Sequence, residues 1–130
     1  MTHTMEDLRI ESHERGDELR SLIDVADDLR GVLRDMAALV HIARRKGSAA
    51  DVKRRDLDSW ALDINASEDR VYVLLSMGDP HVELDILRSE SCGVDEVILR
   101  RSLSPFHDRA WTRDDRALNV VEDFLDLIGC

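Results

Sequence analysis

The chain has 130 residues, of which 43% are hydrophobic and 35% are charged, and its formal net charge at pH 7 is −10. This length and composition predict a single folded domain over residues 1–130 and exclude an intrinsically disordered chain. No apolar run reaches the roughly 18 residues that a membrane-spanning helix needs, and the polar start lacks a secretory signal, so we expect a cytoplasmic protein.

The first element is a long helix, predicted over residues 17–46. Apolar side chains recur there at alternating spacings of three and four, which places them on one stripe: Leu19, Leu22, Ala26, Leu29, Leu33, Met36, Val40 and Ala43. Gly31 interrupts the helix at a cost of about 1 kcal/mol relative to alanine. Before the helix, residues 1–16 are expected to form a flexible or helical arm.

Two arrangements of this stripe are compatible with the sequence. A helix of about 30 residues would be roughly 45 Å long, which exceeds the diameter of such a domain, so part of it would project. A second copy of the chain would then pair with the helix as a coiled coil, forming a homodimer through Leu29, Leu33, Met36 and Val40. In the alternative arrangement, the sheet of the same chain covers the stripe.

A basic segment follows the helix. Residues 44–55 carry six basic side chains and one acid, placed on either side of Gly47 and Ser48. These bases either contact an anion such as RNA, or pair with carboxylates of the same chain or of a second copy. The acidic balance of the whole chain favours the pairing.

The second half of the chain changes to a period of two, which is typical of strands with one buried face. Apolar and polar residues alternate in four runs, at residues 60–64, 71–77, 82–87 and 96–100. Because short segments rich in turn-forming residues separate the runs, we predict a four-stranded antiparallel meander.

The chain is predicted to end in a helix over residues 112–128. Thr112 and Asp115 resemble a capping box at its start, and Gly129 is a typical C-terminal stop. The preceding residues 102–111 are interpreted as an ordered loop. This order of elements predicts an α+β domain with one helical layer and one sheet layer.

Candidate residues for catalysis are few. His81, Glu83 and Asp85 are spaced by two and share one face of a predicted strand, where they either bind a divalent metal, act as acid and base, or are merely solvated. The solvated interpretation is favoured. The chain has no glycine-rich phosphate loop or nucleophile elbow, and Cys92 and Cys130 form no CxxC pair. We therefore predict a non-enzymatic protein without a cofactor.

The segment that is predicted to form most of the sheet is strongly acidic. Residues 56–99 contain eleven acidic residues and only two arginines. Four of these acids alternate outwards on three predicted strands and others flank them. The predicted partner contacts are Asp63, Glu83, Asp85 and Glu96, with Asp56, Asp58 and Asp69 at the rim. Rows of carboxylates can imitate phosphates and occupy the basic groove of a nucleic-acid-binding protein, although a solvated acidic face has the same pattern. We predict no direct binding of nucleic acid through this face, because phosphates repel its carboxylates.

One segment resembles a known motif. Residues 72–84 read YVLLSMGDPHVEL, which resembles the pattern YxxLSTGGPHxEL of small proteins encoded by phages and mobile elements. Met77 stands where threonine is usual, and Asp79 where the second glycine is usual. Those proteins are similar in layout, with a helical N-terminal half, a strand–GGP–strand hairpin and an acidic C-terminal helix. The resemblance implies a mobile-element origin and, by analogy with anti-CRISPR proteins, an inhibitor that binds a host protein.

These features lead to two functional hypotheses. In the first, the protein is a non-enzymatic, phage- or plasmid-encoded inhibitor in the bacterial cytoplasm. It binds a CRISPR effector complex, or another basic nucleic-acid-binding protein, through its carboxylates and blocks DNA binding. In the second, the protein is a homo-oligomeric interaction module that pairs through the long helix and has no immune target.

Overall fold

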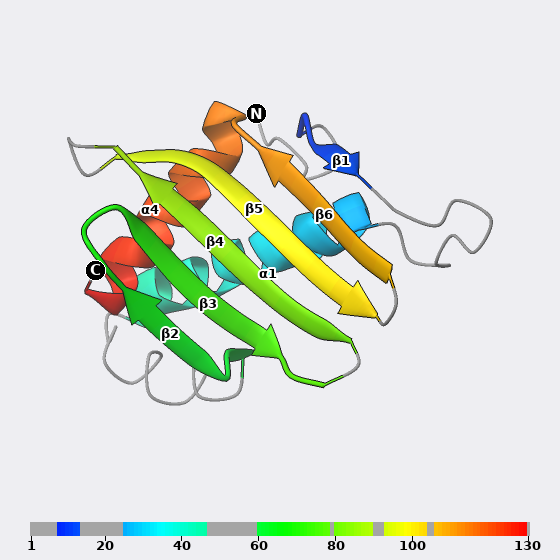
Figure 1. Ribbon diagram of the computed structural model, residues 1–130. Coiled ribbons are helices and arrows are strands. Elements are labelled where there is room, and N and C mark those ends of the chain that lie inside the picture. Colours follow the sequence, from blue (N-terminus) through cyan, green and yellow to red (C-terminus); the bar gives the residue numbers. More distant parts are fainter. Residues whose placement is uncertain are drawn as a thin grey trace.

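The computed structural model describes residues 8–13, 25–46, 60–78, 80–89, 93–103 and 106–129. Within these ranges, two helices pack on one face of a six-stranded antiparallel sheet (Figure 1). The elements are β1 (Glu11–His13), α1 (Val25–Lys46), β2 (Asp63–Ala66), β3 (Arg70–Ser76), β4 (His81–Arg88), β5 (Val94–Leu103), β6 (Phe106–Thr112) and α4 (Asp115–Ile128). The strands lie side by side in the order β1-β6-β5-β4-β3-β2. The predicted α+β class and antiparallel sheet are confirmed, but the sheet has more strands than the four predicted.

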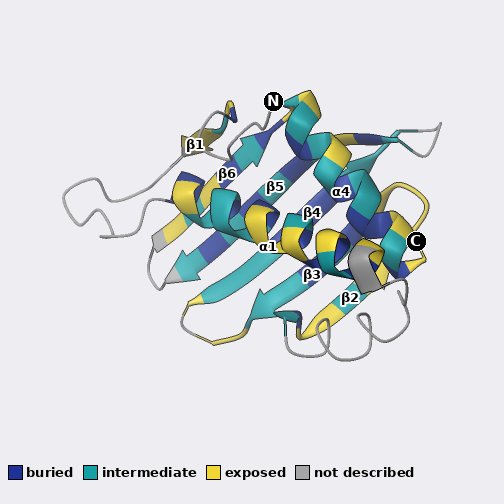
Figure 2. Cartoon of the chain, turned by 180° about the vertical axis from the view of Figure 1, so that it is seen from behind, coloured by how far each residue is buried: buried dark blue, intermediate teal, exposed yellow. Residues whose placement is uncertain are grey.

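The stripe on α1 is part of the core of the single chain. Leu29, Leu33 and Met36 have no exposed surface, and Val40 is 7% exposed. Figure 2 shows α1 and α4 together over one face of the sheet, where they cover its buried residues. The stripe is therefore covered by its own chain, which is the second of the two arrangements that the sequence left open. The predicted helix start, with Leu19 and Leu22, lies outside the described residues.

The three central strands face the helices with alternate residues, as their period of two predicts. The inward side chains are fully buried: Val71 and Val73 on β3, Leu84 and Ile86 on β4, and Val97 and Leu99 on β5. Their neighbours in sequence point to the opposite side of the sheet. β2 begins at Asp63 and extends to Ala66, so this strand starts and ends later than the run at 60–64 predicted.

The prediction of a loop at residues 102–111 is wrong. β5 continues to Leu103, and β6 returns beside it from Phe106, with Leu99 opposite Ala110 and Arg101 opposite Asp108. A search for alternating apolar residues misses β6, because three of its inward positions hold Asp108, the small Ala110 and Thr112. Trp111, a large residue of this strand, lies on the outer side of the sheet.

The N-terminal arm and the start of α4 also differ from prediction. Residues 11–13 form the edge strand β1, which pairs with β6. The Thr112 hydroxyl donates to the Arg9 carbonyl at 2.7 Å, so this segment is attached at the end of β6. α4 is capped by Asp114 rather than Thr112, while Gly129 ends it in the left-handed conformation with φ of 77°, as predicted.

Arg44, at the start of the basic segment, pairs within the chain. The Arg44 guanidinium lies 3.2 Å from the Asp123 carboxylate of α4. This pair agrees with the favoured interpretation, although the acid belongs to the helical layer. Residues 47–59, Cys92 and Cys130 lie outside the described residues. Neither described helix is long and apolar enough to cross a membrane.

Candidate functional site

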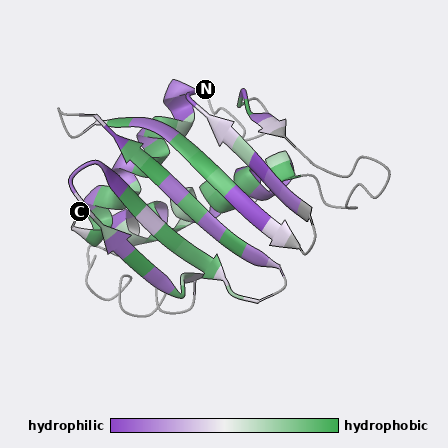
Figure 3. Ribbon diagram, viewed as in Figure 1, coloured by the Kyte–Doolittle hydropathy of each residue, from purple (hydrophilic) through white to green (hydrophobic). Residues whose placement is uncertain are grey.

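The outer side of the sheet is the candidate functional site. Among the described residues, both helices lie on the opposite side, so neither covers it (Figure 1). We call this surface the open sheet face. It consists of Asp63, Arg70, Tyr72, Leu74, His81, Glu83, Asp85, Leu87, Glu96, Ile98, Arg100, Arg109 and Trp111. Figure 3 shows that hydrophobic and hydrophilic residues alternate along its central strands.

The register brings residues from four strands into one row across this face. Tyr72 lies opposite Asp85, Asp85 opposite Ile98, and Ile98 opposite Trp111. Directly opposed residues point to the same side of an antiparallel sheet. Two aromatic residues and one aliphatic residue therefore share the face with the predicted carboxylates.

Glu83 is the acceptor at the centre of a hydrogen-bonded cluster. Its Oε2 accepts from the Tyr72 hydroxyl at 2.5 Å and lies 3.2 Å from His81 Nε2, while its Oε1 is 3.9 Å from Arg100 Nε. Burial raises the pKa of Glu83, but hydrogen bonds from Tyr72 and His81 and the charge of Arg100 lower it below its ordinary value. The same hydrogen bond to Glu83 raises the pKa of Tyr72 to about 12, so this phenol stays protonated as a donor.

Asp85 is a buried carboxylate and not the exposed contact that the sequence predicts. Its side chain is only 4% exposed, 3.0 Å from Arg100 Nε and 3.3 Å from the Arg70 guanidinium. Burial raises the pKa of Asp85 above its ordinary value, because the two arginines offset only part of the desolvation. Asp85 therefore links β3, β4 and β5 through ion pairs.

The remaining predicted contacts differ in exposure. Glu96 pairs with Arg113 at 2.9 Å and its side chain is 14% exposed. Asp63 is exposed on β2, and Asp69 is exposed in the turn before β3, where it accepts from the Ser67 hydroxyl at 3.1 Å. Asp56 and Asp58 lie outside the described residues.

The open sheet face is consequently a mixed-charge surface rather than a row of free carboxylates. The sequence predicts the positions of Glu83, Asp85 and Glu96 on one face, and the register confirms them. It does not reveal the arginines that pair with these acids, which come from neighbouring strands or, for Glu96, from Arg113 just after β6. Nor does it reveal the contact of Arg109 with the Trp111 ring at 5.4 Å. The signal for these partners is opposite charge on facing strands, which is readable only when the register is known.

The metal hypothesis receives no geometric support from His81, Glu83 and Asp85. His81 contacts Glu83, whereas Asp85 is held by arginines. Among the described residues, no group of three or more His, Cys, Asp or Glu side chains is placed to hold a metal ion.

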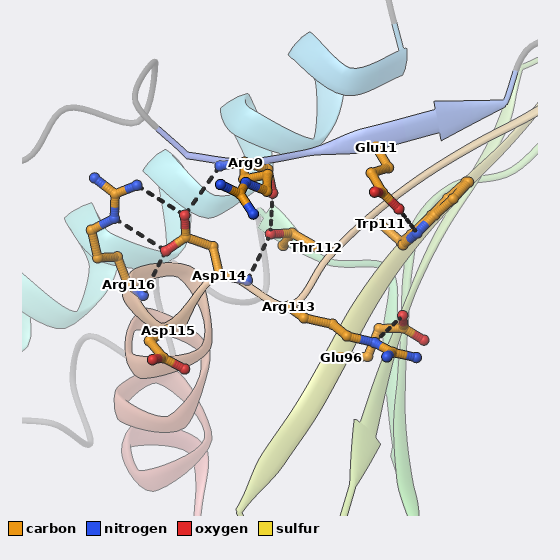
Figure 4. Close-up of a pocket in the computed structure, with 9 residues that line it drawn as sticks. All are labelled: Arg9, Glu11, Glu96, Trp111, Thr112, Arg113, Asp114, Asp115 and Arg116. Carbon is orange, nitrogen blue, oxygen red and sulfur yellow. Dashed lines mark hydrogen bonds and ion pairs between the residues drawn. The ribbon is translucent and has the colours of Figure 1, made fainter.

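A polar pocket of about 670 Å³ lies where β1, the end of β6 and the start of α4 meet (Figure 4). Its side chains pair with one another: Trp111 Nε1 donates to Glu11 at 2.8 Å, and Arg113 Nε donates to Glu96 at 2.9 Å. The pocket is therefore best explained as a structural junction that attaches the N-terminal segment and the helix to the sheet.

Asp114 is the central acceptor of this junction. Its carboxylate accepts from the backbone N–H of Arg9 at 3.1 Å, the backbone N–H of Arg116 at 3.0 Å and the Arg116 guanidinium at 2.9 Å. The hydrogen bond from the Arg116 side chain, together with the two backbone N–H groups, holds the pKa of Asp114 well below its ordinary value despite the burial.

Asp114→Asn should lower the free energy of unfolding by about 1–2 kcal/mol at neutral pH, because the amide keeps the cap and loses the charge-assisted bonds. The folded pKa is depressed, so this contribution is present above the ordinary value of 3.8 and is lost as pH falls below it. Urea unfolding of both proteins between about pH 7 and about pH 3 measures this change. Asp115→Asn in the same helical turn is the control, and a difference for Asp114→Asn that is constant with pH would contradict the assignment.

The chain was compared with protein-family models, curated proteins and solved structures, and none of these comparisons gives a significant match. The motif at residues 72–84 begins within β3 and ends within β4, and these two strands pair antiparallel. Gly78 lies between the two strands with φ of 100°, a conformation that favours glycine.

Proposed function

We propose that the protein is a non-enzymatic inhibitor that binds a basic, nucleic-acid-handling protein complex through the open sheet face and blocks its access to DNA. The observation that carries the proposal is the position of both described helices on one side of a six-stranded sheet, which leaves the other side to a partner. The strands β3, β4, β5 and β6 each have at least seven residues. The face is thus broad enough to dock a folded protein.

The composition of the open sheet face supports a protein partner. Tyrosine, tryptophan and arginine are the residues most enriched among energetically important interface positions. Tyr72, Trp111, Arg100 and Arg109 provide all three types on the central strands and β6. Tyr72 and Trp111 are half-buried in the isolated chain and retain surface for contact.

The charge of the chain supports a basic partner through long-range attraction. The net charge of −10 accelerates the approach of a positively charged surface, with a strong dependence on salt. Because Asp85 and Glu96 already have arginine partners, close contact depends less on direct carboxylate mimicry than the sequence predicts. Exposed acids at the margin, such as Asp63, are the better candidates for contact with the partner.

The resemblance of residues 72–84 to phage and mobile-element proteins supports the inhibitor class, with a CRISPR effector complex as the proposed target. The test is phage plaquing on bacteria that carry an active, targeting CRISPR system, with and without the protein. Several system types are tested, each beside a strain that lacks the system. We expect restored plaquing confined to one type, and no rescue in any tested type would contradict this target.

Charge reversal at Asp63 tests the proposed surface. Asp63→Lys should reduce the rescue by at least about tenfold, because the exposed acid faces the partner. Asp126→Lys is the matched control, since it makes the same charge change at an exposed position of α4 in the helical layer. Equal loss in both variants would indicate an effect of net charge alone, and equal rescue would exclude Asp63 from the contact.

A further inference from the structure

A second surface, separate from the open sheet face, lies on the helical side of the sheet. A groove of about 680 Å³ opens between α1 and the adjoining ends of β3, β4 and β5. Its apolar lining includes Val32 of α1, Leu75 of β3, Val82 of β4 and the ring of Trp60. This volume is within the roughly 300–1,000 Å³ that is typical of ligand sites. We call it the α1 groove.

Gly31 lines the α1 groove and places no side chain in it. It is the seventh of the 22 residues of α1, and a Cβ added there would have no other heavy atom within 4 Å. A glycine in a helix costs about 1 kcal/mol relative to alanine, and neither a close contact nor a positive φ requires one here. An alanine there would leave the groove open, whereas a large side chain at position 31 would occupy it.

The groove carries negative charge at its helical rim. Asp27, Asp28 and Asp35 of α1 line it, against the single base Arg101. Arg101 is already held by Asp28 at 2.6 Å and by Asp108 at 2.8 Å. Asp27 forms an ion pair with Arg30 of the same helix at 2.8 Å, and Asp35 accepts a hydrogen bond from Trp60 Nε1 at 3.1 Å, while both carboxylates stay exposed. A carboxylate has room for further donors, so both can still attract a cation.

Two large apolar side chains lie exposed next to the groove residues in sequence. Leu62 is 61% exposed and Met77 is 69% exposed. Leu62 lies just before β2, two residues after Trp60. Its backbone N–H donates a hydrogen bond to the carbonyl of Leu74, the residue that precedes Leu75 of the groove. Met77 follows Ser76, which lines the groove. Both side chains thus adjoin groove-lining residues along the chain and add apolar surface that a protein partner can cover.

We propose that the α1 groove binds a segment of the protein partner that carries a large apolar side chain flanked by lysine or arginine. The apolar side chain fills the space over Gly31, between Val32 and Val82, and the flanking cations meet Asp27 and Asp35. This inference rests on the proposed function, because it takes a basic protein as the partner. It adds a site on the helical side, where a basic segment reaches carboxylates that the open sheet face does not provide.

The probe is an amphipathic peptide of about 14 residues, with leucine at helical spacing on one face and lysine on the other. It is titrated into the isotope-labelled full chain and followed by amide NMR shifts, and calorimetry gives the affinity. We expect saturable shifts centred on Gly31, Leu75 and Val82. A peptide with glutamate in place of lysine should not bind, and neither should one with serine in place of leucine.

Variants of the protein test the site itself. Gly31→Phe should weaken binding by at least about tenfold, whereas the matched control Gly31→Ala should change it by less than about twofold. Asp27→Asn with Asp35→Asn should weaken it about fivefold, and the amide oxygen at position 35 still accepts from Trp60. This second variant retains the test if Gly31→Phe disturbs the helix. Absence of shifts at about millimolar peptide, shifts on the open sheet face, or equal binding of the serine peptide would overturn the proposal.

The plaquing assay separates this proposal from the function on which it rests. Rescue by the wild type that is lost in Gly31→Phe and kept in Gly31→Ala supports both. Rescue kept in all three proteins leaves the inhibitor function intact and overturns the groove as a contact with the target. Absence of rescue by the wild type contradicts the inhibitor function, and the peptide titration then decides on the groove alone.

Discussion

Met36→Asp is expected to unfold the protein, with a loss of about 4–5 kcal/mol or more in the free energy of unfolding. Met36 has no exposed surface, and it lies among other fully buried residues of α1 and the sheet. An unpaired carboxylate placed there loses its hydration and gains no described partner. Because a domain of this size has a total stability of roughly 5–15 kcal/mol, the loss removes at least about a third of it and nearly all of it at the lower end of that range. Circular dichroism during urea unfolding measures the change.

The same substitution decides between the two arrangements of the stripe. Ala38→Asp introduces the same charge at an exposed position of α1 and should cost less than about 1 kcal/mol, which is the difference in helix propensity. If the stripe instead joined two copies, Met36→Asp would yield a folded monomer from a wild-type dimer in light scattering. That outcome would contradict the burial of Met36 and restore the homo-oligomeric module as the leading hypothesis.

The parts of the fold that the sequence predicts correctly are those where one face is apolar. α1 repeats its buried residues at helical spacing, and β3 and β4 alternate, so each element specifies its inward face locally. β1 and β6 carry no such pattern. β6 places Asp108 and Thr112 inward, and both have partners on other elements: Arg101 for the first and the Arg9 carbonyl for the second. A buried polar residue is predictable only when its partner is known.

In the candidate site, too, the burial of a polar side chain is predictable only when its partner is known. The spacing of His81, Glu83 and Asp85 places all three on one face, which is correct. Their exposure depends on Arg70 from one neighbouring strand and Arg100 from the other, and these reach the acids only in the observed register. Asp85→Lys would therefore place a third cation between two arginines, so it is a test of folding rather than of partner contact.

Arg101→Leu is the second substitution with a large expected effect, about 3–5 kcal/mol in the free energy of unfolding. The Arg101 side chain is 8% exposed and joins Asp28 of α1 to Asp108 of β6, whose side chains are 28% and 10% exposed. Burial by itself lowers the pKa of Arg101, but the hydrogen bond to Asp108 and the charge of Asp28 raise it above its ordinary value. The guanidinium is thus a buried cation that is neutralised by carboxylates from both layers of the fold.

Leucine at position 101 would fill part of the space but would leave the Asp108 carboxylate buried without its cation. Most of the expected loss comes from that carboxylate, because Asp28 is exposed enough to turn toward water. Arg101→Leu with Asp108→Asn should therefore recover part of the stability in urea unfolding. Arg109→Leu, at an exposed position of the same sheet, should stay within about 1 kcal/mol of the wild type. If Arg101→Leu were equally mild, the ion pairs would add little to stability, and β6 would be held by its backbone hydrogen bonds to β5 and β1.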